Sequence, residues 1–104
     1  MPWVYLFLAG LFEVVWSTTM KLSDGFAHIG YTLATIVCSL FSFVLLGMAT
    51  KNIQLSLAYP IWTGIGAVGS ILAGVLLFKD PMSLKTGFFV ALLIVGLVGI
   101  KLTA

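Results

Sequence analysis

Apolar residues occupy four long blocks along the chain, and short polar stretches separate these blocks. A helix needs about 20 apolar residues to cross the ~30 Å hydrocarbon core of a bilayer, and each block is close to that length. The pattern therefore predicts four membrane-spanning helices, at residues 3–21, 29–49, 54–77 and 84–103. We expect an all-α membrane protein with a single transmembrane domain over residues 1–104.

The polar stretches at residues 21–28, 49–54 and 78–83 contain the turn residues. Pro81 in the third stretch cannot continue a helix that begins before it. Because all three joins are short, we expect consecutive helices to be antiparallel neighbours.

The composition agrees with insertion into a membrane, since 62% of the 104 residues are hydrophobic and 8% are charged. A soluble domain of this size needs more charged surface. The sequence shows no metal-ligand cluster, no nucleophile with a base and no nucleic-acid surface. We therefore expect neither an enzyme nor a bound cofactor.

The positive charges do not favour one orientation in the membrane. All five are lysines: Lys51 and Lys101 fall on one predicted side, and Lys21, Lys79 and Lys85 on the other. Two against three gives no positive-inside bias, so copies could insert both ways up. Two oppositely inserted copies could then pair about an axis in the membrane plane, as an antiparallel, dual-topology homodimer.

One acidic residue lies deep in the first span. Glu13 is the only glutamate and follows Trp3 by ten residues, which is about 15 Å along a helix and near the bilayer midplane. Intramembrane acids usually mark ion or proton pathways, because a charge there costs roughly 3 kcal/mol. Desolvation disfavours the charged form, so this carboxylate could exchange a proton for a cation. The alternative is a protonated glutamate that joins helices by hydrogen bonds.

Polar and aromatic residues on the first two spans lie at a similar depth. Trp16 shares the face of Glu13, where its N–H could donate to a carboxylate and its ring could bind a cation; packing or lipid contact is the alternative. Thr35, Ser39 and Ser42 form a polar stripe on the second span. We expect Thr35 and Ser39 to form hydrogen bonds between helices, and Ser42 to be a pocket residue.

On the third span, Tyr59, Trp62 and Thr63 lie on one helix face. They could form the wall of a cation pocket, although ordinary helix packing also explains such a face. Pro60 removes one backbone hydrogen bond and should bend this helix.

Glycines mark positions of close helix approach. Residues 64–69 match the dinucleotide-binding pattern G-x-G-x-x-G, but that motif needs a preceding strand and a soluble βαβ unit. We interpret Gly64 and Gly66 as points of close packing or bending, and Gly96 and Gly99 on the fourth span as a dimer seam.

Four features stand together in this chain: an acid in the first of four short helices, "EVVW" (13–16), "AY.IWTGIGA" (58–67) and "K.S.GF" (21–26). With them, the sequence resembles the small multidrug resistance transporter family essentially from end to end. The resemblance implies an antiparallel homodimer in the plasma membrane of a prokaryote, exporting cations in exchange for protons. The first-helix glutamates of both subunits would bind protons and substrate in turn, a role that falls on Glu13.

A tryptophan three residues after the acid resembles the guanidinium-exporter subtype, since quaternary ammonium exporters typically have glycine there. The resemblance implies a pocket of Glu13, Trp16, Ser42, Tyr59 and Trp62, with Thr63 and Lys101 as further candidates.

The expected activity is proton-coupled export of guanidinium. One alternative is a broader exporter of quaternary ammonium and other multidrug cations with the same fold. Pro60 and "STTM" (17–20) depart from the family pattern and bear on substrate range. A rival from another class is a structural subunit that transports nothing.

Overall fold

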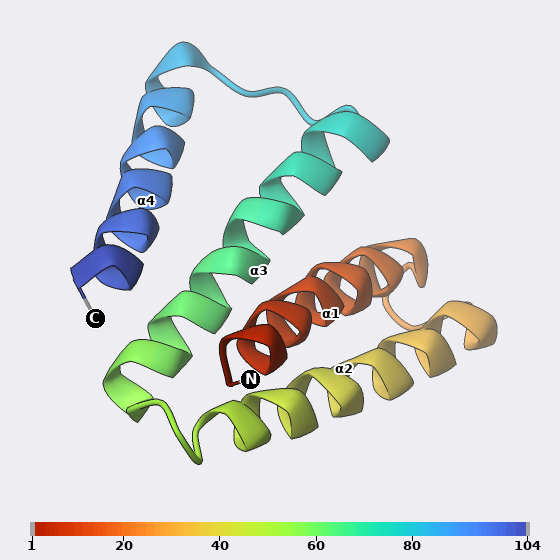
Figure 1. Cartoon of the computed structure of the whole chain (residues 1–104). Coiled ribbons are helices and arrows are strands. Elements are labelled where there is room, and N and C mark those ends of the chain that lie inside the picture. The colour runs from red at the N-terminus through yellow and green to blue at the C-terminus, as the bar shows by residue number, and fades with distance from the viewer. Residues whose placement is uncertain (1, 104) are drawn as a thin grey trace.

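The computed structural model describes residues 2–103 and contains four helices (Figure 1). They are α1 (Pro2–Leu22), α2 (Ile29–Ala49), α3 (Leu55–Leu77) and α4 (Leu84–Thr103). Each is long and apolar enough to cross a membrane, which confirms the prediction of an all-α chain with four candidate spans over the described residues. Helices are stable in the hydrocarbon core of a bilayer because they satisfy their backbone hydrogen bonds internally.

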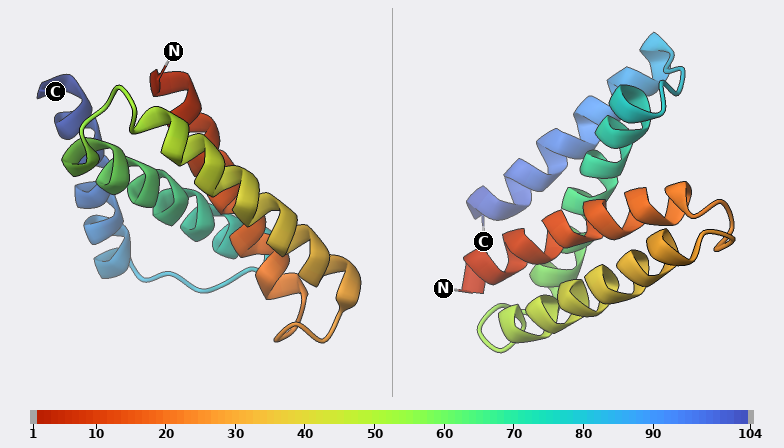
Figure 2. Two further views of the ribbon diagram at one scale, coloured as in Figure 1. Left: turned by 90° about the horizontal axis from the view of Figure 1, so that it is seen from below. Right: turned by 90° about the vertical axis from the view of Figure 1, so that its right-hand side faces the viewer.

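Helix α1 is central to the arrangement. It lies alongside α2 and packs against α3, which crosses it at a wide angle (Figures 1 and 2). Helix α4 packs mainly against α3, and its Lys101 side chain also reaches Trp3 of α1. Helices α2 and α3 have little mutual contact. The expectation that consecutive helices are neighbours holds for this pair over a short stretch only, where Ser42 and Phe43 meet Trp62, because both helices pack mainly against α1.

Small residues fill the contacts between these helices. Ala9 and Gly10 on α1, Ala49 on α2 and Ala58 on α3 are buried. In lipid, helices associate largely through close packing, and small residues let their backbones approach. Helix α4 has no fully buried residue; one stripe of it is half-buried against α3, and its remaining surface is free to meet lipid or another chain.

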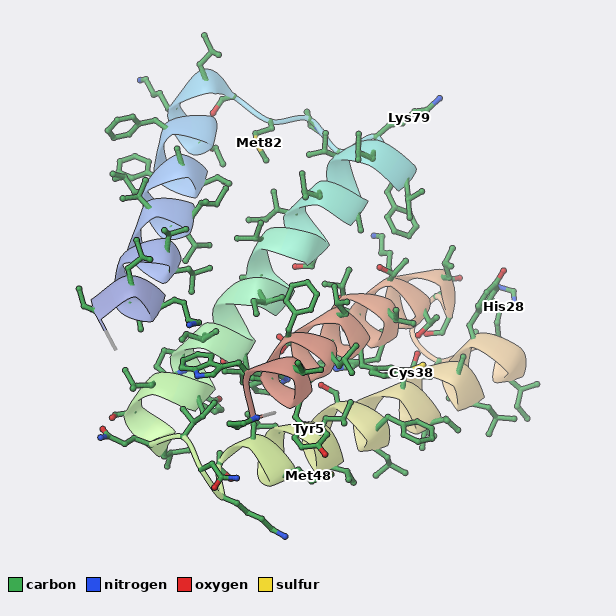
Figure 3. The ribbon with its side chains drawn as sticks, in the orientation of Figure 1. Tyr5, His28, Cys38, Met48, Lys79 and Met82 are labelled. Atoms are coloured by element: carbon green, nitrogen blue, oxygen red, sulfur yellow. The ribbon has the colours of Figure 1, made fainter. Side chains whose placement is uncertain are left out.

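Polar residues occupy the joins between the helices. His28 directly precedes α2, and Lys79 is the second residue after α3, so both side chains lie beyond the ends of the spans (Figure 3). Ser23 is buried in the first join, where its hydroxyl donates to the Met20 carbonyl and accepts the Phe26 N–H. Helix α3 continues through Pro60 without a break.

Candidate functional site

Ser42 joins α1, α2 and α3 through a chain of hydrogen bonds. Its hydroxyl donates to the Ala9 carbonyl over 2.7 Å and accepts the N–H of Trp62 Nε1 over 2.9 Å. Ser42 is completely buried and Trp62 is 6% exposed. In an α-helix the carbonyl of Ala9 also accepts the N–H of Glu13, four residues later. The chain of hydrogen bonds therefore reaches the helical turn that carries the glutamate.

The carboxyl group of Glu13 packs directly against the backbone of Gly66 on α3. A Cβ atom at position 66 would occupy the space of that carboxyl group. Oε2 of Glu13 is buried and has no hydrogen-bond partner among residues 2–103. A buried polar atom without a partner costs free energy. A hydrogen-bond donor on a bound cation would satisfy this oxygen, whereas a proton would remove its charge.

Trp16 lies one helical turn after Glu13, and its indole N–H is also buried without a partner in the described part of the chain. The hydrogen bond to a carboxylate that the spacing allows is thus not formed in this structure. Helix α1 therefore carries a buried acceptor, on Glu13, and a buried donor, on Trp16, that are both unsatisfied. Buried polar groups left unpaired in this way usually have an additional partner or a functional role.

Aromatic rings surround the indole of Trp62. The Tyr59 ring lies 5.5 Å from it between centroids and the Phe43 ring lies 5.7 Å from it, both tilted. Tyr59 is 52% exposed, so this edge of the aromatic group is open. Such rings contribute packing between helices and offer faces to which a planar cation can bind.

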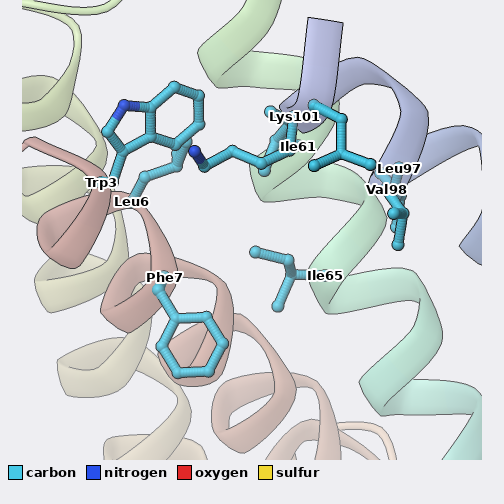
Figure 4. Close-up of a pocket in the computed structure, with 9 residues that line it drawn as sticks. Trp3, Leu6, Phe7, Ile61, Ile65, Leu97, Val98 and Lys101 are labelled. Atoms are coloured by element: carbon cyan, nitrogen blue, oxygen red, sulfur yellow. The ribbon is translucent and has the colours of Figure 1, made fainter. Parts of the chain in front are cut away.

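Other predicted site residues lie elsewhere. Thr63 is exposed on α3. The Lys101 ammonium lies over the Trp3 ring, 4.2 Å from its centroid, at the mouth of a separate cavity (Figure 4). Gly64 packs against Leu97 of α4, where a Cβ would clash with the leucine side chain.

The predicted dimer seam is open space in the single chain. Apart from the chain neighbours and the backbone of α4 itself, no heavy atom of the described residues lies within 4 Å of a Cβ built on Gly96 or Gly99. Both glycines are exposed in the single chain. A surface that contacts a second copy would also be exposed when one copy is viewed alone.

The two hydroxyls assigned to hydrogen bonds between helices behave differently. Thr35 does reach another helix, since its hydroxyl lies 2.7 Å from that of Thr19 on α1. Ser39 instead donates to the Ile36 carbonyl within α2. The prediction for Ser39 is wrong because a serine in a helix can bond to a carbonyl of its own preceding turn.

Two contributors to this site were not singled out from the sequence. Ala9 supplies only its backbone carbonyl, and since every residue has one, no sequence signal marks it. Phe43 is one of many apolar residues in its span, so nothing in the sequence distinguishes it, whereas its polar neighbour Ser42 stands out. The contact between the Phe43 and Trp62 rings becomes visible only once the structure places Trp62 against α2.

We expect Ser42→Ala to lower the free energy of unfolding by about 1 to 2 kcal/mol, because it leaves the Trp62 N–H buried without an acceptor. Unfolding by dodecyl sulfate in mixed micelles, followed by circular dichroism, measures this change. Ser39→Ala is the matched control, since it removes a hydroxyl from the same helix that bonds only within that helix. Equal losses for the two variants would contradict the proposed link between helices.

The chain is similar over its length to known proteins. The family described as Small Multidrug Resistance protein matches residues 1–93. A protein named Guanidinium exporter from Salmonella typhimurium is 39% identical over 104 residues, covering 100% of this chain and 99% of that protein. Proteins of the same name from Yersinia pseudotuberculosis and Escherichia coli are each 38% identical, covering 100% and 99% of this chain and 100% and 98% of their own length.

Proposed function

The chain belongs to the Small Multidrug Resistance protein family, and we propose that it is a transporter that exports guanidinium in exchange for protons. The similarity over the full length to relatives named Guanidinium exporter carries this proposal. The bacterial origin of these relatives supports a location in the plasma membrane of a prokaryote.

Glu13 is the proposed binding group for both substrate and protons. Guanidinium is planar and presents a fork of N–H donors that fits the two oxygens of a carboxylate. The unsatisfied Oε2 of Glu13 can accept one of these donors. The flat faces of the ion can stack on the ring of Trp16 or Trp62. Ser42 would hold the Trp62 indole in place through their hydrogen bond.

Competition for Glu13 would couple the two fluxes. A protonated carboxyl group has no charge to hold the cation, and a bound cation displaces the proton. In a homodimer with one Glu13 from each copy, we expect two protons to exchange for one guanidinium. Each cycle then moves one net charge, which is worth about 2.3 kcal/mol per 100 mV of membrane potential.

The proposed assembly is an antiparallel, dual-topology homodimer in which each chain forms a single transmembrane domain. Helix α4 has no buried residue in the single chain, so it has surface available for a partner. Gly96 and Gly99 are exposed on this helix and would allow close approach of a second α4. The near-even division of lysines between the two sides supports insertion in both orientations.

Flux measurements on purified protein in liposomes test this function. With an imposed proton gradient, we expect guanidinium to be transported at least roughly tenfold faster than tetraethylammonium, a difference of about 1.4 kcal/mol. An imposed membrane potential should also drive uptake. Comparable rates for the two cations would favour the broader exporter instead, and transport that ignores the potential would contradict the stoichiometry.

A further inference from the structure

Two adjoining apolar cavities lie between α1, α3 and α4. One has a volume of about 400 Å³ and the other about 320 Å³. Both are lined by Ile65, Leu97 and Val98, so they adjoin, and the two together are called the α1–α4 groove. It exists because α4 packs on α3 but leaves the side facing α1 uncovered.

One end of the α1–α4 groove carries a positive charge. Lys101 is the one charged side chain among the described residues that line either cavity. Its ammonium extends across the mouth of the groove to the face of Trp3, with Phe7 and Ile65 deeper inside (Figure 4). Trp3 lies early in α1 and Lys101 late in α4, so both are at the depth where tryptophan and lysine meet lipid headgroups.

The length of the groove matches one leaflet of a bilayer. Its lining on α1 runs from Trp3 in the first cavity to Val14 in the second. At 1.5 Å per residue these positions are about 16 Å apart along the helix. The hydrocarbon core is about 30 Å thick, so the groove reaches from the interface to near the midplane. An acyl chain of one leaflet spans the same depth.

We propose that the α1–α4 groove binds an anionic phospholipid, with one acyl chain along the apolar walls and the phosphate beside Lys101. The positive charge of Lys101 would repel a cationic substrate, so this groove does not suit one. The apolar lining below Lys101 suits hydrocarbon and offers no acid to pair with the ammonium. Basic positions between transmembrane helices are known to bind anionic headgroups in this way.

Native mass spectrometry of the full chain tests the headgroup contact. Purified protein is titrated with phosphatidylglycerol or with phosphatidylcholine, and bound lipids are counted. We expect stronger retention of phosphatidylglycerol, and Lys101→Gln should weaken that binding about fivefold, the effect of one lysine near an anionic lipid. Lys51→Gln is the matched control, because Lys51 lies on the same predicted side but does not line the groove.

A second pair of variants tests the position of the acyl chain. Val98 lines both cavities, so Val98→Trp should fill the groove and reduce binding of both lipids. Val44→Trp places the same bulk on an exposed position of α2 and should leave binding unchanged. Circular dichroism of each variant verifies that its helices are retained.

Three results would overturn the proposal. The first is equal retention of the two lipids by the unmodified protein. The second is the same phosphatidylglycerol binding in the Lys101 and Lys51 variants. The third is a change in oligomeric mass, with lipid binding unaltered, in Val98→Trp; that result would assign the groove to a second copy of the chain.

Discussion

Replacing Glu13 by glutamine should abolish guanidinium-driven proton movement while leaving the four helices intact. Glutamine has nearly the same shape, but it carries no charge and cannot take up or release a proton at this position. Losing one partner of a desolvated, hydrogen-bonded charge pair costs about 2 to 5 kcal/mol, which corresponds to a loss in substrate affinity of roughly 30-fold or more. Flux in liposomes and proton release on addition of guanidinium in detergent measure the two effects.

The pH dependence gives this prediction a definite sign. In the unmodified protein, guanidinium binding should weaken as the pH falls, since protons then occupy Glu13, and should strengthen as the pH rises. Any binding left in Glu13→Gln should not vary with pH. Asp24→Asn removes a carboxylate from the exposed first join and should behave like the unmodified protein. Ion fluxes unchanged in Glu13→Gln, with altered assembly, would instead support a structural subunit.

The four spans could be predicted because the bilayer restricts what a chain can do. Backbone groups in hydrocarbon must be paired, so a long apolar block between polar turns becomes a helix. The packing of the helices could not be predicted in the same way. It depends on local shape, such as the fit of Ile65 on α3 against Gly10 on α1. Hydropathy contains no information about such a fit, so it could not show that α2 and α3 pack mainly against α1 rather than against each other.

The candidate site was partly visible in the sequence for similar reasons. Depth and charge single out Glu13, and helical spacing places Tyr59 on the face of Trp62, where the structure has their rings in contact. The partner of Ser42 could not be found, because the Ala9 carbonyl resembles every other carbonyl. The orientation of the Lys101 side chain could not be predicted either, because a flexible side chain takes the conformation that its tertiary contacts favour, here the contact with the Trp3 ring.

Gly66→Ala should strongly reduce guanidinium transport, although it adds only a single methyl group. That methyl group would take the space of the Glu13 carboxyl group, so the carboxyl must move or α1 and α3 must separate. A displacement of about 1 Å at a reacting group can cost roughly 100-fold in rate. Overpacking should also lower the free energy of unfolding by about 1 to 3 kcal/mol. Flux in liposomes and unfolding in dodecyl sulfate report these effects separately.

Gly47→Ala is the matched control, because Gly47 also lies within a helix and a Cβ there would meet no atom of another helix in the described chain within 4 Å. This variant should transport normally and should be unchanged or slightly more stable, since alanine favours helix by about 0.5 to 1 kcal/mol over glycine. Normal transport by Gly66→Ala would contradict the proposed role of the contact between Gly66 and Glu13. A loss confined to Gly66→Ala would mean that α3 sets the position of the carboxyl group on α1. Any movement of α3 against α1 would then change how Glu13 meets its proton or cation, which is the coupling that an exchanger requires.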